Sequence, residues 1–284
     1  MRIIDSHVHF WRIGGPGQTW PDAGWPLIYR DFGPAELLEA TASLSSGEPA
    51  SAVVQGIVLV QSQPDDRDTD WLLEIAAELP RVAGVVGWVD LASPLAPARI
   101  TELARRPKLR GLRPMLQAIE DTQWLLGSEL EAALQAMLQQ GLRFDALIQP
   151  RHLPVLMEFA RRWPKLPIVI DHGAKPRVAL GEIEPWQAHM AELSLFPNVH
   201  CKLSGLRTEQ AAGAPSAELE PYVRLLAMSF QDRLMWGSDW PVLLHSGDRY
   251  SDWLQTSLQL AARSEGVTLD CLFHQAASRF YGLG

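Results

Sequence analysis

Two histidines separated by one residue stand near the N-terminus, in the segment Asp5-Ser6-His7-Val8-His9. Residues two apart in an extended segment point to the same side, so the imidazoles of His7 and His9 can converge on one cation or one substrate oxygen. Two ordinary polar residues at the end of a strand would give the same pattern. The pair therefore gains chemical meaning only if other reactive groups reach the same place.

Two later segments supply such groups directly after apolar runs. His172 follows Ile168-Val169-Ile170 in the segment DHGAKP, and Asp239 follows Trp236 in the segment WGSDWP. A carboxylate at the position of Asp239 could ligate a metal or act as a general base. The alternatives are a capped turn around His172 and a helix N-cap at Asp239.

Cationic side chains lie in two further apolar segments. Lys202 stands inside Val199–Leu203, where a lysine is costly unless it is paired or functional, and alternation places Ser204 on the same face. The alternative is that Lys202 points to a surrounding helix layer. Arg110 and Arg113 are an odd spacing apart, so one of them faces inward, and we favour Arg113 because it lies further along the chain. We expect Arg113, Lys202 and Ser204 to bind substrate.

The chain has eleven tryptophans, and most are expected in the core. Trp25 and Trp240, together with Trp11 and Trp20, fall in segments predicted to be loops, where an aromatic face could stack on a substrate ring. The irregular segment 11–33 follows the first strand directly. We expect it to cover the site and exclude bulk water.

The elements that must position these groups are predicted from periodicity. Eight short runs rich in β-branched residues read as strands, at Arg2–Asp5, Val53–Val60, Val82–Val89, Leu109–Leu112, Arg143–Ile148, Ile168–Asp171, Val199–Leu203 and Arg233–Trp236. Helical patterns occupy Asp70–Leu79, Glu129–Gln140, Pro154–Trp163, Pro185–Leu195, Ser216–Met228, Asp252–Arg263 and Thr268–Tyr281.

The strands lack period-two alternation, which favours parallel strands buried on both faces. Alternating strands and helices in 284 residues predict one α/β domain, residues 1–284, with a single (β/α)8 TIM barrel. Catalytic groups of such barrels lie at the C-terminal ends of the strands. A doubly wound open sheet is the second choice, since the first strand lacks a glycine-rich phosphate turn.

Composition excludes several other classes of protein. The net charge is −8 with no basic block, which disfavours a nucleic-acid or membrane partner. Two cysteines cannot form a disulfide framework, and no signal peptide or membrane span is evident. We expect a cytoplasmic protein with a small-molecule substrate; its oligomeric state is left open.

Taken together, the strings DSHVHFW (5–11), DHGAKP (171–176), KLSGL (202–206) and WGSDWPV (236–242) resemble the amidohydrolase superfamily. They are most similar to the branch that holds sugar lactonases, such as L-fuconolactone and L-rhamnonolactone hydrolases, and 2-pyrone-4,6-dicarboxylate hydrolases. The strings span almost the whole chain. The resemblance implies an amidohydrolase barrel in which His7, His9, His172 and Asp239 gather around one cavity.

This chain departs from the dinuclear members of that superfamily. They carry a carboxylated lysine on strand four and a histidine after strand five, whereas this sequence has Arg110 and Arg113 on strand four and Gln149 after strand five. A two-metal site is therefore not expected. His7, His9 and Asp239 could hold one divalent ion, zinc being the expected metal, and the enzyme could equally work without metal.

The resemblance implies a lactonase of carbohydrate catabolism in which Asp239 activates water and His172 assists. A second hypothesis is a metal-dependent decarboxylase of an aromatic or enoic acid on the same barrel. A third is a barrel that only binds ligands, against which the complete set of His7, His9, His172 and Asp239 argues.

Overall fold

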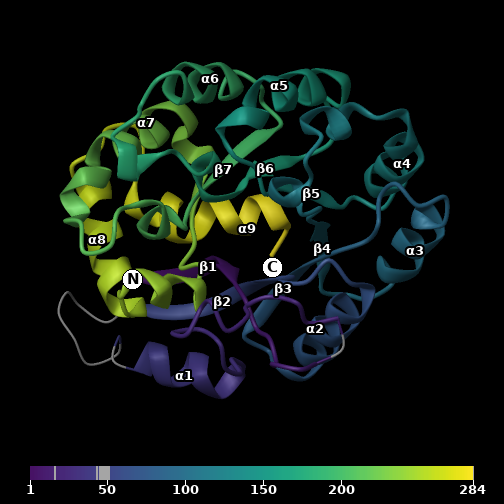
Figure 1. Cartoon of the computed structure of the whole chain (residues 1–284), viewed down its shortest axis with the longest axis horizontal. Helices are drawn as coiled ribbons and strands as arrows, with labels where there is room; N and C mark the ends of the chain where they lie inside the picture. Colours follow the sequence, from purple (N-terminus) through teal and green to yellow (C-terminus); the bar gives the residue numbers. More distant parts are fainter. Residues whose placement is uncertain (16, 43, 45–51, 284) are drawn as a thin grey trace.

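Eight parallel strands form one sheet that curls into a nearly closed barrel with helices around it (Figure 1). The structure is a computed structural model that describes residues 1–15, 17–42, 44 and 52–283. The strands are β1 (Arg2–Val8), β2 (Val53–Val60), β3 (Val82–Gly87), β4 (Leu109–Leu112), β5 (Arg143–Ala146), β6 (Ile168–Ile170), β7 (Val199–Leu203) and β8 (Leu234–Trp236). Their order in the sheet is their order in the chain. The predicted (β/α)8 barrel is confirmed.

The ring closes between β1 and the segment just past β8. Val8 forms a parallel bridge with Trp240, and the His9 N–H donates to the Trp240 carbonyl over 2.8 Å. The Asp239 N–H donates to the His7 carbonyl over 2.9 Å. Main-chain hydrogen bonds therefore hold the first and the last reactive segments at the same rim.

Apart from charged residues such as Asp145 and Lys202, the strands are largely apolar on both faces, because each face meets its own hydrophobic cluster. Along β2, Ile57 and Leu59 pack outward into the cluster formed with the helices, whereas Val58 and Val60 pack into the barrel interior. All four residues are fully buried. This explains why the strands show no alternation of apolar and polar residues.

The helices are α1 (Pro34–Ala42), α2 (Asp66–Glu78), α3 (Ala96–Leu103), α4 (Glu131–Gln139), α5 (Leu153–Arg162), α6 (Trp186–Leu193), α7 (Glu220–Phe230), α8 (Tyr250–Ala262) and α9 (Ala276–Tyr281). Helices α1 and α3 were not predicted. Helix α2 begins one turn before the predicted Asp70, because the Asp65 side chain caps it by accepting the Arg67 N–H. The predicted final helix is interrupted by the π-helical segment Cys271–Gln275.

Several strand ends also differ from the prediction. The first strand continues from Asp5 to Val8. The third ends at Gly87 instead of Val89, because the Trp88 N–H donates to the Thr69 hydroxyl instead of to a neighbouring strand. The fifth ends at Ala146 instead of Ile148, and the Leu147 carbonyl accepts the Gln117 N–H of a loop.

Helix α9 closes the lower end of the barrel, where the strands begin. In Figure 1 it crosses the centre of the ring. Its residues Phe280 and Tyr281 pack with Val58, Val86 and Met235 in the interior cluster. The opposite end, where the strands finish, is therefore the end that can receive a ligand.

Within the described residues, no helix combines the length and the apolar character that crossing a bilayer requires. The cytoplasmic location stays a prediction.

Candidate active site

Four residues predicted from distant parts of the chain meet at the upper end of the barrel. His7 Nε2 lies 3.1 Å from His9 Nε2 and 3.7 Å from Asp239 Oδ1. Asp239 Oδ1 lies 3.4 Å from His9 Nε2 and 4.0 Å from His172 Nε2. All four side chains are buried. The structure thus brings together His7, His9, His172 and Asp239 as the sequence predicted.

The backbone at Asp239 adopts an unusual conformation to reach this point. Its φ is 58°, in the left-handed region, which costs a non-glycine residue roughly 1–2 kcal/mol. Asp tolerates this region better than most residues. The hydrogen bond from the Asp239 N–H to the His7 carbonyl holds the turn in place.

His172 stands in a longer left-handed turn. His172, Gly173, Ala174 and Lys175 all have φ between 51° and 61°. The turn is anchored by Trp186 Nε1, which donates to the Gly173 carbonyl over 2.7 Å. Such strain persists only where the surrounding structure fixes the conformation, and it clusters at functional sites.

Ser204 fixes the ring of His172. Its Oγ lies 2.9 Å from His172 Nδ1. The next residue, Gly205, has φ 62°, and a Cβ there would lie 2.4 Å from the same Nδ1. Only glycine leaves room for the ring. Burial lowers the pKa of His172 to about 4, so the ring is neutral at pH 7.

The hydrogen bonds of His9 define which of its nitrogens faces the cavity with a lone pair. His9 Nδ1 lies 2.8 Å from the Val60 carbonyl oxygen, which can only accept, so Nδ1 carries the proton. Burial lowers the pKa of His9, which keeps the ring neutral. Its Nε2 then presents a lone pair toward His7 and Asp239.

Lys202 lies beneath these residues with its ammonium fully enclosed. Nζ contacts Asp145 Oδ2 at 2.6 Å, Asp171 Oδ1 at 2.9 Å and His7 Nδ1 at 3.1 Å. The ammonium thus faces two carboxylates and one imidazole nitrogen, and all four residues are 0% exposed. Asp145 also accepts the Tyr281 hydroxyl of α9 over 2.6 Å. Burial and the charge of Lys202 hold the pKa of His7 well below its usual value.

Arg113 connects the buried charged residues around Lys202 to the cavity. Its Nη1 lies 3.3 Å from Asp171 Oδ2 and 3.3 Å from His7 Nε2, and its Nη2 donates to the Gln61 carbonyl. Arg110, in contrast, turns away and donates to the Pro107 carbonyl over 2.8 Å. The inward orientation expected for Arg113 is the one observed.

A cavity of about 440 Å³ opens above the four convergent residues. Segment 11–33, whose residue 16 lies outside the described residues, contributes Thr19, Trp20 and Trp25 to its wall. The ring of His245 packs on Trp25, with centroids 4.5 Å apart. The segment therefore covers the barrel mouth as predicted. The other lining residues are His9, Ser62, Pro64, Arg113, Met115, Gln117, Ala118, Leu147, His172, Lys175, Thr208, Glu209, Asp239 and Val242.

Three residues expected to bind substrate do not line this cavity. Lys202 is enclosed by its three acceptors, and Ser204 is buried behind the ring of His172. Trp240 is also buried, packing against Phe10 and Phe32 on the outer side of the rim. Of the expected set, Arg113 and Trp25 reach the cavity.

Sequence reasoning also missed residues that matter here. Asp145 and Asp171 were not recognised as the partners of Lys202, although a carboxylate within the apolar segment 143–148 is a signal of the same kind as the lysine. Lys175 and Glu209, which form an ion pair of 3.4 Å at the cavity wall, were given no role.

The convergent donors fit one divalent cation. The ligand atoms of His7, His9 and Asp239 all lie within 4.8 Å of one another. His9 already presents a lone pair at Nε2. His7 needs its proton on Nδ1 to do so, which is the tautomer opposite to the one that the Lys202 ammonium, 3.1 Å from Nδ1, favours without a metal. Asp171 Oδ1 lies 3.5 Å from the same nitrogen, and such a carboxylate partner is typical of metal-bound histidines.

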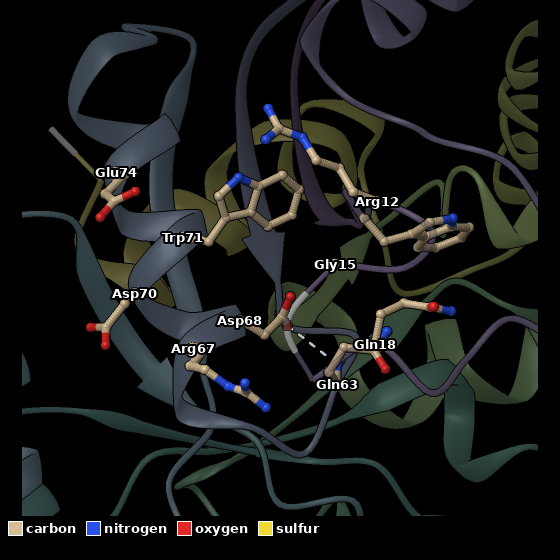
Figure 2. Close-up of a pocket in the computed structure, with 10 residues that line it drawn as sticks. Arg12, Gly15, Gln18, Gln63, Arg67, Asp68, Asp70, Trp71 and Glu74 are labelled. Atoms are coloured by element: carbon tan, nitrogen blue, oxygen red, sulfur yellow. Dashed lines mark hydrogen bonds between the residues drawn. The ribbon is translucent and has the colours of Figure 1, made fainter.

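A second cavity, of about 330 Å³, lies beside α2 (Figure 2). Figure 2 shows Asp68, Asp70 and Trp71 on this helix, with Trp71 toward Arg12, whose guanidinium carbon lies 5.3 Å from the centroid of the Trp71 ring. The carboxylate of Asp68 accepts two main-chain N–H groups, and Asp70 pairs with Arg99 at 2.6 Å. These acids have structural partners, so the volume alone does not indicate a reactive site.

Comparison with known proteins agrees with this geometry. The family model described as amidohydrolase matches residues 4–283. An L-fucono-1,5-lactonase of Burkholderia ambifaria is 49% identical over 93% of this chain and 89% of its own length. A second L-fucono-1,5-lactonase, from Burkholderia multivorans, is 34% identical over 99% of this chain and 96% of its own.

Solved structures show the same architecture. A crystal structure of a Burkholderia multivorans amidohydrolase with bound zinc has a TM-score of 0.88, with 30% identity and complete coverage of both chains. A 5-carboxyvanillate decarboxylase from Sphingomonas paucimobilis has a TM-score of 0.59 at 15% identity, covering 100% of this chain and 99% of its own. The second likeness shows the fold alone.

Proposed function

The chain belongs to the amidohydrolase family, and we propose that it hydrolyses the ring ester of a small sugar lactone. Two relatives that match over most of the chain are named for L-fucono-1,5-lactone, which suggests the substrate class. The observation that carries the proposal is the meeting of Asp239, His172 and Arg113 in one cavity. Together they provide a base, a neutral imidazole and a fixed cation.

Asp239 is the proposed general base. Burial alone would raise the pKa of this carboxyl, but His172, His9 and His7 hold it well below its usual range, so the group is ionised. The 4.0 Å between Asp239 Oδ1 and His172 Nε2 is too long for a direct hydrogen bond, so both groups are free to bind a water that enters the cavity. Asp239 takes a proton from this water as the water oxygen attacks the carbonyl carbon of the lactone. It then returns the proton to the ring oxygen as the bond between that oxygen and the carbonyl carbon breaks.

Arg113 is proposed to stabilise the carbonyl oxygen as it gains negative charge. Its guanidinium is always charged, and its contacts with Asp171 and the Gln61 carbonyl hold it in a fixed position. A preorganised donor of this kind acts strongly in a site shielded from water. His7 can assist, since the Lys202 ammonium at Nδ1 favours a proton on Nε2.

His7, His9 and Asp239 are the residues that would hold a divalent ion, and we propose zinc. When bound, that ion would polarise the carbonyl and lower the pKa of a bound water. The roles of Arg113 and His172 in binding and orientation are the same with and without it.

The proposal is tested by following acid release with a pH indicator from a panel of aldono-lactones. We expect turnover of at least one aldono-lactone, and parallel assays with and without chelator measure metal dependence. Folded protein that releases no acid from any lactone would contradict the proposal. Carbon dioxide release from an aromatic acid in the same preparation would favour the decarboxylase hypothesis instead.

A further inference from the structure

We propose that Lys175 and Glu209 form a pair that binds neighbouring ring hydroxyls of the lactone and so selects polyhydroxylated substrates. This inference rests on the proposed lactonase function and names the side chains that recognise the substrate. Both residues line the cavity that contains Asp239 and His172.

The two side chains are arranged loosely enough to accept a ligand. Lys175 Nζ lies 3.4 Å from Glu209 Oε1, longer than the 2.7–2.9 Å of a strong charge-assisted hydrogen bond. Their side chains are 23% and 24% exposed, so they are sheltered but not sealed. In the described part of the chain, Glu209 is the only residue that pairs with the Lys175 ammonium. The ammonium has three N–H donors, so donors remain for substrate oxygens.

The contrast with Lys202 supports a different role for each lysine. Lys202 has acceptors at 2.6, 2.9 and 3.1 Å for its three donors and is closed to the cavity. Lys175 keeps unused donors and faces the cavity. Lys202 is therefore suited to a structural role, and Lys175 is suited to binding a ligand.

The strained turn at 172–175 delivers Lys175 to this position. The left-handed conformation of His172 continues through Gly173 and Ala174 to Lys175. The Lys175 N–H donates to the His172 carbonyl over 2.8 Å, closing the turn. The result is that the ammonium of Lys175 and the imidazole of His172 line one cavity, three residues apart.

The chemistry of the pair fits a neutral polyol. Each sugar hydroxyl both donates and accepts, so an ammonium and a carboxylate side by side can bind two neighbouring hydroxyls. Trp20 and Trp25 line the same cavity and offer an apolar face to the C–H side of a sugar ring. A dianionic lactone would instead meet the negative charge of Glu209, which disfavours that class.

The test compares two lactones with the same six-membered ring, an aldono-1,5-lactone and δ-valerolactone, which carries no hydroxyls. The variants are Lys175→Met and Glu209→Gln. For the aldono-lactone we expect KM to rise about tenfold with kcat changed much less, as loss of a hydrogen bond to a charged group predicts. For δ-valerolactone, kcat/KM should stay close to the wild-type value.

Arg177→Met is the matched control, because Arg177 pairs with Glu182 at a similar 3.3 Å but outside the cavity. This variant should leave KM and kcat for both lactones unchanged. Thermal unfolding of each variant checks the fold.

Three outcomes would overturn the inference: equal losses on both lactones, a lower kcat with unchanged KM for the aldono-lactone, or no change with either. If wild-type enzyme does not open δ-valerolactone, the split between KM and kcat on the aldono-lactone decides the matter. A wild-type enzyme that opens no lactone would refute the proposed function itself, which is a distinguishable result.

Discussion

The two ends of the barrel use the same eight strands for opposite purposes. At the upper end, His7, His172 and Asp239 are buried beneath an open cavity. At the lower end, Phe280 and Met235 pack in an apolar cluster closed by α9. Polar groups that are costly to bury are thus gathered toward the upper end, while the lower end supplies most of the apolar burial.

A layer of buried charge separates the two ends. It contains Lys202 with its acceptors Asp145 and Asp171, and the Tyr281 hydroxyl reaches it from below. We expect changes at the upper end to affect turnover, changes at the lower end to affect stability, and changes in this layer to affect both. Substitutions at each of the three levels test this division.

The largest effect is expected at the upper end, from Asp239→Asn. Loss of the general base should lower kcat on the order of a thousandfold. The fold should survive, because Asn also tolerates the left-handed conformation that Asp239 adopts. Steady-state kinetics and thermal unfolding measure the two effects. A variant with near-normal kcat would show that another group activates water.

Lys202→Met tests the middle layer. Without the cation, Asp145 and Asp171 are left buried beside each other, which should destabilise the protein by about 3–5 kcal/mol. His7 loses a donor at Nδ1, so kcat per folded molecule should also fall. Urea unfolding and kinetics on the folded fraction measure both.

Lys108→Met is the control for this layer, because Lys108 donates to the Ala76 and Leu79 carbonyls far from the cavity. Its effect on kcat should be small. Unchanged kcat in Lys202→Met would show that the charged layer supports stability and has no part in catalysis.

Tyr281→Phe removes one hydroxyl at the boundary between the layer and the lower end. The lost hydrogen bond to the Asp145 carboxylate should cost roughly 1.5–3 kcal/mol of stability, with little change in kcat. Tyr222→Phe is the comparison, since that hydroxyl donates to the neutral Glu182 carbonyl and should matter less. A large loss of kcat in Tyr281→Phe would show that α9 also contributes to catalysis.

The smallest expected effect is a change in how stability depends on pH, and it arises at the lower end of the barrel. The ring of His200 packs on Phe280, and burial lowers the pKa of His200 from 6.5 to about 4. Between these values the unfolded chain binds a proton that the folded protein does not, so stability falls as the pH drops from 6.5 toward 4.

His200→Leu removes this contribution. The fall in Tm between pH 7 and pH 5 should therefore be smaller in the variant than in the wild type, with activity at pH 7 unchanged. Equal falls in Tm would show that His200 does not contribute to the acid sensitivity.

The barrel could be predicted from local patterns, because apolar runs mark the strands and the ends of parallel strands share one rim. That His7, His9, His172 and Asp239 meet at one point of this rim was predicted from the resemblance to the amidohydrolase superfamily. Side-chain partners could not be predicted in this way. The enclosure of Lys202 depends on distances between three strands, and the burial of Trp240 depends on how the rim packs against Phe10 and Phe32.

The left-handed turn at 172–175 was also beyond prediction. Of its residues only Gly173 favours positive φ, whereas His172, Ala174 and Lys175 adopt it because tertiary contacts impose it. Local propensity predicts the opposite at these three positions.

The position of α9 has a consequence for how the protein folds. Residues Phe280 and Tyr281 lie more than one hundred and thirty positions after Asp145, yet they fill the lower end of the barrel and Tyr281 donates to the Asp145 carboxylate. The strands and the outer helices can form from contacts between neighbours in the chain, whereas the interior of the barrel stays incomplete until α9 docks. Such distant contacts have a high entropic cost of loop closure, so the docking of α9 is expected to be a late step in folding.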